Sequence, residues 1–201
     1  MSKQTGHEEA IRIAVEKLQN IDLDTRCVNL GLAKPRNGIV RLRAFGTDMV
    51  LRQSDFRLFP LGSDEPAKSV DRILVLHYLL CDLPIHVTGE LISFRQLTGG
   101  QFYWEPFVSR SVRPLVRGIG NNLELLRKNL DTFDWEPLSL GDLGARIHII
   151  GKLHLTLVYR LGDDEFPPTA DLLFDAGIKR IYNAEDAAVL ASRICMELKN
   201  G

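Results

Sequence analysis

Two runs of β-forming residues on either side of Gly151-Lys152 constrain the fold of this chain more than any other feature. Residues 145–150 and 153–161 are each long enough for a strand, and apolar residues alternate with mostly polar ones in the second run. So short a connection joins antiparallel strands. The β-forming segments of the chain are linked by hairpins and not by βαβ units, which excludes a Rossmann-type nucleotide site.

A second group of β-forming segments lies before residue 60. Residues 27–33 and 39–45 flank residues 35–38, where a proline and an Asn-Gly pair supply the backbone geometry of a turn. This pattern predicts a hairpin, which a third strand within residues 49–59 extends into a meander. The Gly- and Pro-containing segment 60–66 then marks the clearest break in the chain.

Helical periodicity accounts for most of the remaining chain. Residues 8–21 are amphipathic, and residues 69–81 are apolar around most of the helix, so we expect the second helix at the centre of the fold. Short helical pieces are predicted within residues 104–119, followed by a helix over 123–130 with Asn121 or Asn122 as its N-cap. The last helix, residues 184–198, has Asn183 as its N-cap and Cys195 on its core side.

Together these segments predict an α+β fold. Small antiparallel sheets, an N-terminal meander and a C-terminal hairpin, pack with a central apolar helix and with terminal helices. With 201 residues, of which 45% are hydrophobic, the chain is expected to form a single domain over residues 1–201. Residues 8–66 would hold the first helix and the meander, and residues 69–201 the α+β core.

Charge and cysteine content exclude several classes of protein. The 25 basic and 26 acidic residues are mixed along the chain, so we expect neither nucleic-acid nor membrane-surface binding. The three cysteines are far apart, form no CxxC pair and follow no signal peptide, which predicts a reducing, cytoplasmic location. No apolar run approaches the roughly 18 residues that a membrane span needs.

Residues 89–122 carry the strongest candidate for a ligand site. The Gly99-Gly100 pair allows close approach of the backbone to a ligand or to a neighbouring strand. Arginines spaced at i, i+3 and i+7 beside a Tyr-Trp pair could receive a carboxylate or phosphate, or could pair with nearby glutamates and stabilise the fold. The candidate ligand-binding residues are Gly99, Gly100, Tyr103, Trp104, Arg110, Arg113, Arg117 and Asn121.

Histidines and acidic residues give only a minor metal-site candidate. A two-residue turn at Gly151-Lys152 would place His148 and His154 on opposite faces of the hairpin, and only a three-residue loop would set them side by side. The acidic residues Asp163, Asp164 and Glu165 lack the spacing of a calcium-binding loop and are typical of a solvated turn. His77 is interpreted as a hydrogen-bonded core histidine, because no second ligand accompanies it.

Several blocks of the sequence nevertheless resemble a known family. They are HYLL at residues 77–80, GELISFRQLTGGQFYWEPFVSR at 89–110, RPLVRGIGNN at 113–122, GDDEFPPTADLLFD at 162–175 and AED at 184–186. In this order they are similar to the family of anaerobic bacteria and archaea called domain of unknown function 3786. The resemblance covers roughly residues 73–190. It departs at Leu153-His154, where the family often has Leu-Pro, and at Ile119-Gly120, where it often has Phe-Gly.

The resemblance implies little about activity, because the family has no established one. Some members are joined to, or encoded beside, iron–sulfur and corrinoid methyl-transfer proteins, so an iron–sulfur or corrinoid protein is the partner that the resemblance implies. The chain has no iron–sulfur cysteine set of its own. The resemblance assigns no cofactor.

Three hypotheses of function follow. The first is a non-catalytic binding or accessory module, in which residues 99–117 and the loop 163–175 flank a concave site for a small anionic ligand or a protein partner. The second is an enzyme or cofactor-binding protein of corrinoid or one-carbon metabolism, in which a deep pocket brings a carboxyl group and an imidazole within hydrogen-bond reach. Its candidate groups are Tyr103, His148 or His154, and Asp164 or Glu165. The third is a protein-interaction scaffold that forms a homodimer. The sequence contains no recognised catalytic motif, which favours the first.

Overall fold

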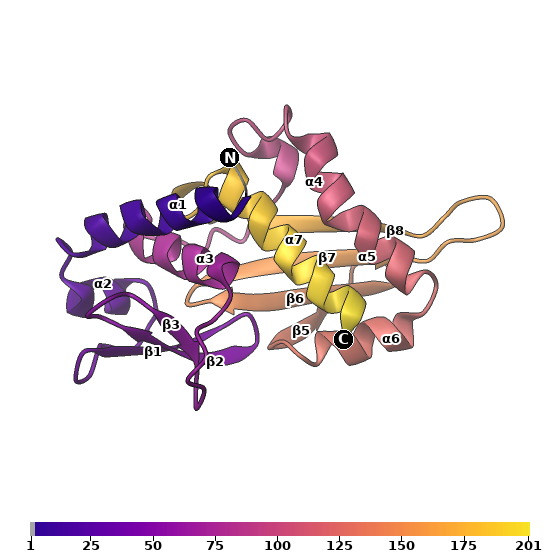
Figure 1. The fold of residues 1–201 in the computed structure, drawn as a ribbon. Helices are drawn as coiled ribbons and strands as arrows, with labels where there is room; N and C mark the ends of the chain where they lie inside the picture. Colours follow the sequence, from indigo (N-terminus) through magenta and orange to yellow (C-terminus); the bar gives the residue numbers. More distant parts are fainter. Residues whose placement is uncertain (1–2) are drawn as a thin grey trace.

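The computed structural model describes residues 3–201 and confirms the α+β class. Its strands form an eight-stranded antiparallel sheet in the order β3-β2-β1-β6-β7-β8-β4, and β5 pairs with β6 beside this path (Figure 1). The strands are β1 (Ile39–Ala44), β2 (Thr47–Arg52), β3 (Leu58–Pro60), β4 (Leu91–Ser93), β5 (Trp135–Leu138), β6 (Leu143–Ile150), β7 (Leu153–Arg160) and β8 (Thr169–Asp175).

The helices match the periodicity of the sequence in most places. They are α1 (Lys3–Leu18), α2 (Leu23–Asn29), α3 (Ser69–Leu80), α4 (Trp104–Arg110), α5 (Val112–Ile119), α6 (Leu123–Leu130) and α7 (Ala184–Asn200), with short 3-10 turns η1 (Phe94–Gln96) and η2 (Ala176–Arg180). The side chains of Asn122 and Asn183 cap α6 and α7, as the sequence predicts. The thiol of Cys195 is fully buried in α7, and burial raises its pKa far above the ordinary value.

The N-terminal meander and the C-terminal hairpin are joined by a narrow connection. Ala44 at the end of β1 lies opposite Ile150 of β6, and the Phe45 amide donates to the carbonyl of Ile149 over 2.8 Å. The two predicted groups of strands are therefore continuous in one sheet.

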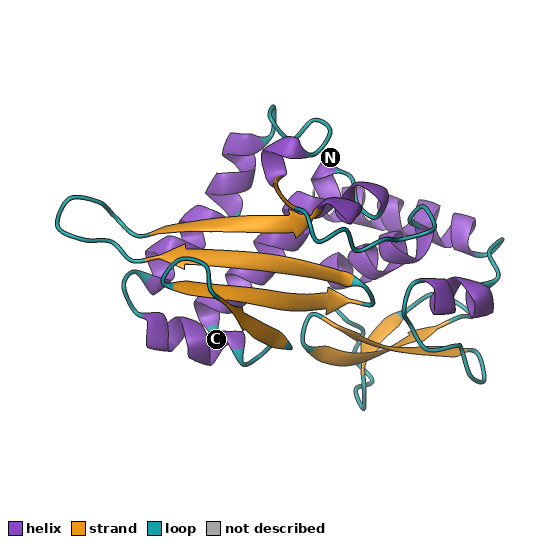
Figure 2. Cartoon of the chain, turned by 180° about the vertical axis from the view of Figure 1, so that it is seen from behind, coloured by secondary structure: helices purple, strands orange, loops and turns teal. Residues whose placement is uncertain are grey.

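Helices cover only one face of the central strands. Helices α5 and α7 lie across that face, whereas the view from behind shows β6, β7 and β8 with no helix in front of them (Figure 2). Cross-strand ion pairs lie on the uncovered side: Arg146 with Glu136 and Arg160 with Asp171, each at 2.7 Å. Such ladders are typical of a solvated sheet face.

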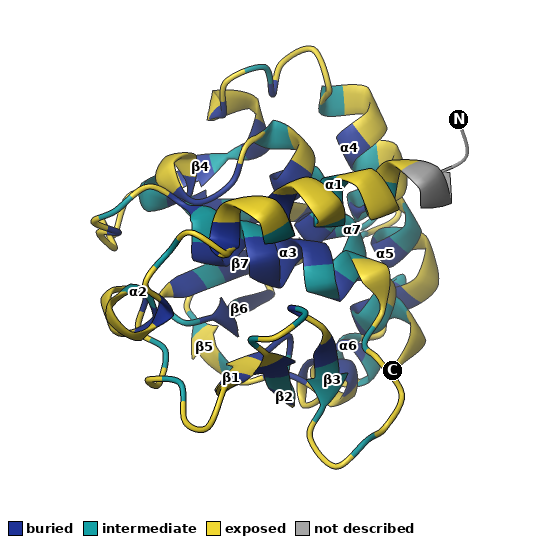
Figure 3. Ribbon diagram, turned by 60° about the vertical axis from the view of Figure 1, so that its left-hand side comes forward, coloured by how far each residue is buried: buried dark blue, intermediate teal, exposed yellow. Residues whose placement is uncertain are grey.

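Helix α3 is the central apolar helix that the sequence predicts. It is buried over most of its surface, between α1 and the sheet (Figure 3). The hydroxyl of its Tyr78 donates to the carbonyl of Leu30 over 2.7 Å and accepts from the amide of Lys152 over 2.9 Å. One buried side chain thus connects the end of α2 with the β6–β7 turn.

The prediction of a strand over residues 27–33 was wrong, because residues 27–29 form the end of helix α2. Leu23, Cys27 and Leu30 are buried at a spacing of four and three, which is a helical period, whereas Val28 is exposed. The Asp22 side chain caps the helix by accepting from the Asp24 amide. Apolar residues at every second position at the end of the segment gave the alternation that is typical of a strand.

Three further details differ from the expected strands. The β1 hairpin turns at Phe45-Gly46 and not at residues 35–38, where a single bridge joins Arg36 and Ile39. The segment 49–59 contributes to two strands, β2 and β3, because a turn interrupts it. Strand β5 was not predicted, and its Pro137 is a residue that strands disfavour.

Candidate functional site

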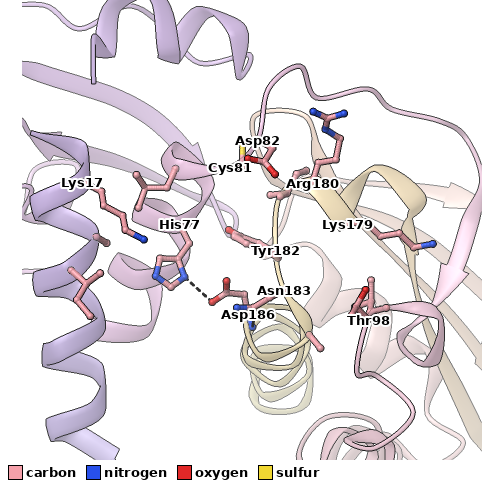
Figure 4. A pocket seen from close by; sticks show the side chains of 16 residues that line it. Lys17, His77, Cys81, Asp82, Thr98, Lys179, Arg180, Tyr182, Asn183 and Asp186 are labelled. Atoms are coloured by element: carbon pink, nitrogen blue, oxygen red, sulfur yellow. Dashed lines mark hydrogen bonds and ion pairs between the residues drawn. The ribbon is translucent and has the colours of Figure 1, made fainter. Parts of the chain in front are cut away.

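A pocket of about 490 Å³ lies where α1, α3 and the N-terminus of α7 meet. Residues Leu97 and Thr98, directly before the Gly99-Gly100 pair, supply part of its wall, and residues 179–181 supply another part. Figure 4 shows side chains from these separate segments around one space. The size is that of a site for a small organic molecule.

A histidine and an aspartate form the polar centre of the pocket. The Nδ1 of His77 on α3 lies 2.8 Å from Oδ1 of Asp186 on α7. A carboxylate can only accept, so Nδ1 carries the hydrogen and Nε2 is the nitrogen that remains available. Within residues 6–201, Nε2 has no hydrogen-bond partner. In its neutral form, His77 can therefore accept a proton from a bound molecule at Nε2. In its protonated form, the ring is a cation that can bind an anionic molecule.

The local structure of α7 explains why an aspartate can be buried here. Asp186 is 8% exposed and stands in the first turn of α7, where the helix dipole favours negative charge. The backbone amide of Asp186 donates a hydrogen bond to the side-chain oxygen of Asn183 over 2.8 Å. His77 and the helix end therefore compensate the cost of burying the carboxylate.

Three basic residues are among those that line the pocket. Lys17 reaches in from α1, and Figure 4 shows its ammonium turned toward the ring of His77. Lys179 and Arg180 also line the pocket, although their charged ends point away from His77 in the same view. Asp82 is the other acidic residue in the lining besides Asp186. Lys17 is thus the basic residue of the lining that a negative group at the centre of the pocket would meet.

Two further ionisable groups in the lining are held protonated. Burial raises the pKa of Cys81 to about 11 and raises the pKa of Tyr182 well above its ordinary value. The Tyr182 hydroxyl donates to the carbonyl of Leu74 over 2.7 Å. A thiolate nucleophile is therefore not available near neutral pH, and the imidazole is the group with proton-transfer chemistry.

The predicted arginine site does not coincide with this pocket. Arg110, Arg113 and Arg117 are exposed on α4 and α5 and do not line it. A break at Ser111 separates the two helices, so the three arginines do not stand on one continuous helix. Arg113 lies 3.6 Å from Glu105, which corresponds to the predicted ion-pair alternative.

The aromatic residues of the same stretch have separate environments. Tyr103 is exposed and directly precedes α4. Trp104 is half-buried, with the guanidinium of Arg95 at 4.3 Å from its ring centre and Phe107 stacked at 5.6 Å. Trp104 thus packs within the fold and not against an open cavity.

The remaining predicted ligand residues have structural contacts. A Cβ on Gly100 would lie 2.0 Å from the carbonyl oxygen of Phe94, so the group that approaches it closely is the chain's own backbone. Gly99 has a φ of +81° in the same turn. The Asn121 side chain makes two hydrogen bonds to the backbone of Gly162, at 3.0 and 2.8 Å.

The two sheet histidines lie side by side, which the predicted two-residue turn did not allow. A bulge between His148 and Ile150 shifts the register, so that His148 pairs with His154 and their ring centres are 5.3 Å apart. The pKa of His154 is lowered, first by burial and then by Arg146. His148 Nε2 lies 3.1 Å from the carbonyl of Gly151 and is thereby occupied.

The acidic candidates lie in the loop between β7 and β8. Asp163 accepts from the amides of Glu165 and Phe166, and these bonds hold its pKa below the ordinary value. Asp164 and Glu165 are exposed. Within residues 6–201, no group of three histidine, cysteine or acidic side chains has the geometry to hold a metal ion.

The sequence reading missed the pairing of His77 with Asp186. His77 is hydrogen-bonded, as interpreted, but it also faces a pocket. A signal was present, since His77 belongs to the HYLL block and Asp186 to the AED block. The arginine-rich stretch belongs to the same set of blocks, so the resemblance alone does not single out this pair.

The fold and the site define an α+β protein whose antiparallel sheet is covered by helices on one face and whose pocket is centred on a His–Asp pair. The chain belongs to the family described as domain of unknown function (DUF3786), whose model matches residues 22–197. No curated protein and no solved structure matches the chain. Among the helices described, none has both the length and the apolar character to cross a membrane.

Proposed function

We propose that this protein is a binding module for a small organic anion, which occupies the pocket between α1, α3 and α7. The observation that carries the proposal is the pair of groups at its centre. The Lys17 ammonium and Nε2 of His77 face the same space, and neither has a hydrogen-bond or ion-pair partner within residues 6–201. A carboxylate or phosphate would pair with the Lys17 ammonium, and Nε2 of His77 would accept from a protonated oxygen of the anion or, when the ring is protonated, donate to it.

The resemblance adds an accessory role to this proposal. Iron–sulfur and corrinoid proteins are the partners that it implies, and the chain would serve them by holding the anion. Its own cysteines, Cys27, Cys81 and Cys195, are all buried, so the partner would supply any cluster. Family membership supports this role only in general terms, since the family has no assigned activity.

Replacing Lys17 by methionine is expected to weaken anion binding about 10- to 100-fold, because a charge-assisted hydrogen bond contributes roughly 1.5–3 kcal/mol. Sodium phosphate, malonate and citrate would be titrated calorimetrically, and their effect on thermal unfolding compared with that of sodium chloride at equal ionic strength. Lys128→Met removes the same charge from an exposed position on α6 outside the pocket and is expected to change nothing. Equal binding by both variants and the wild type would place the anion elsewhere.

The His–Asp pair favours an acid–base enzyme as the second candidate. A pocket with a carboxyl group and an imidazole in hydrogen-bond contact is the feature expected of the enzyme hypothesis, although the residues are His77 and Asp186 instead of Tyr103, His148, His154, Asp164 or Glu165. In such an enzyme, Asp186 would orient the ring, and Nε2 of His77 would take a proton from a bound substrate.

Asp186→Asn tests the enzyme role of this pair. The amide oxygen can still accept from Nδ1 of His77, but the negative charge that stabilises a protonated ring is lost. We expect anion binding that uses the protonated ring to weaken, and any turnover to fall by about 100-fold or more. Turnover would be measured on chromogenic ester, thioester and phosphate-ester substrates, and a melting curve would confirm folding. Equal turnover in the variant and the wild type would rule out the enzyme role for this pair.

A further inference from the structure

Helix α5 presents two arginines on its outer side that the pocket does not use. Arg113 and Arg117 are four residues apart and therefore neighbours on one side of the helix; we call them the arginine face. Both are exposed, and Arg117 forms no ion pair within residues 6–201. Arg113 has only a loose contact, 3.6 Å, to the largely exposed Glu105. The positive charge of this face is mainly uncompensated.

The loop between β7 and β8 carries the opposite charge. Residues 161–168, here called the acidic arm, extend beyond the helices and the sheet in both the front and the rear view (Figures 1 and 2). Asp163, Asp164 and Glu165 are exposed there and form no ion pair within residues 6–201. The next residue, Phe166, is 66% exposed, which is unusual for a large apolar side chain.

The acidic arm has a fixed shape. Asn121 holds Gly162 at its base through two hydrogen bonds, and Asp163 accepts from the amides of Glu165 and Phe166 at 2.9 and 2.7 Å. A Cβ on Gly162 would lie 2.6 Å from the nitrogen of Pro168, so the two sides of the arm are in close contact. A segment that is already ordered loses little conformational entropy when it docks.

The arm and the arginine face are neighbours that do not meet within one chain. Asn121, which holds the arm, follows the end of α5 at Ile119 by two residues. No ion pair nevertheless joins Asp163, Asp164 or Glu165 to Arg113 or Arg117. Because the two complementary surfaces are neighbours on one chain, two copies related by a two-fold axis can make both contacts at once. Each copy then places its acidic arm against the arginine face of the other.

We propose that a second copy of this chain docks through this reciprocal contact. The charged side chains Asp164 and Glu165 of one copy pair with Arg113 and Arg117 of the other, and Phe166 provides the apolar contact. Exposed charge pairs contribute little one by one, so the dimer is weak, depends on both symmetric contacts and dissociates as salt screens them. The anion pocket lies outside this contact, so the dimer is independent of the proposed binding function.

Sedimentation velocity of the full chain tests the proposal. At about 0.05 M ionic strength the wild type is expected to form dimers with a micromolar dissociation constant, and at about 0.5 M it is expected to be monomeric. The variants R113E/R117E and D164K/E165K are each expected to raise the dissociation constant about tenfold or more, because both contacts become repulsive. R36E/R41E changes the same charge on exposed residues before β2 and is expected to leave the dimer intact.

Mixing the two variants provides the decisive measurement. In a heterodimer of R113E/R117E with D164K/E165K, the lysine arm meets the glutamate face while the acidic arm meets the arginine face, so both contacts are attractive again. A one-to-one mixture, with one variant fluorescently labelled, is expected to dimerise like the wild type. A wild type that stays monomeric up to about 1 mM, dimers that neither reversal weakens, or a mixture without heterodimers would each overturn the proposal.

Discussion

Replacing Arg193 by methionine is expected to lower the free energy of unfolding by about 3–5 kcal/mol, because it leaves a buried carboxylate without its partner. The guanidinium of Arg193 on α7 donates to Asp71 of α3 over 2.8 Å, and the two side chains are 14% and 6% exposed. Arg193 also donates to Glu197 over 2.8 Å. The comparison would be made by chemical denaturation with equal slopes for both proteins.

Two further variants isolate the ion pair between Arg193 and Asp71. Arg160→Met breaks the pair with Asp171, in which both side chains are about half exposed, and should cost less than about 1 kcal/mol. The double variant D71L/R193M removes both buried charges and should be more stable than R193M alone. A loss in R193M no larger than that in R160M would show that solvent reaches Asp71 in the folded protein.

Replacing Gly46 by alanine is expected to cost more than about 4 kcal/mol or to prevent folding, for two reasons that act together. Gly46 has a φ of +76° in the β1–β2 turn. A Cβ there would also lie 2.1 Å from the carbonyl oxygen of Thr132 and 3.0 Å from Cα of Phe133. Both contacts are to backbone, so no flexible side chain can move aside.

Gly62→Ala separates the steric effect from the conformational one. Gly62 has a similar φ of +80°, but a Cβ there would meet nothing within 4 Å. Its substitution should cost only about 1 kcal/mol, the ordinary penalty for a left-handed alanine. Thermal and chemical unfolding of both variants would give the difference. Equal losses would mean that the turn and residues 132–133 can separate without affecting the rest of the fold.

The fold was predictable where one periodicity dominated a segment. The apolar face of residues 69–81 and the alternation in residues 153–161 gave α3 and β7, because each pattern extends over several repeats. Helix α2 was misread because its seven residues are followed by apolar residues at a spacing of two. The bulge at His148 and the pairing of β1 with β6 depend on contacts between distant segments, which periodicity does not record.

The candidate site was predictable only in part. The stretch 89–122 was expected to carry a site, and it contributes only a wall of the pocket, through Leu97 and Thr98 just before its glycine pair. The polar centre combines His77 and Asp186, which are 109 positions apart. Neither residue is distinctive alone, and only the packing of α3 against α7 makes them a pair.

The Tyr78 hydroxyl has a consequence for how the chain could be divided. It is bonded at once to Leu30, in the N-terminal segment, and to Lys152, in the central hairpin. Cutting the chain in the loop near residue 62, its clearest break, would leave the larger fragment with a buried phenol that lacks an acceptor, and the smaller one with an unpaired carbonyl. Joining the two fragments again would restore this hydrogen bond, so each fragment carries the group that the other lacks.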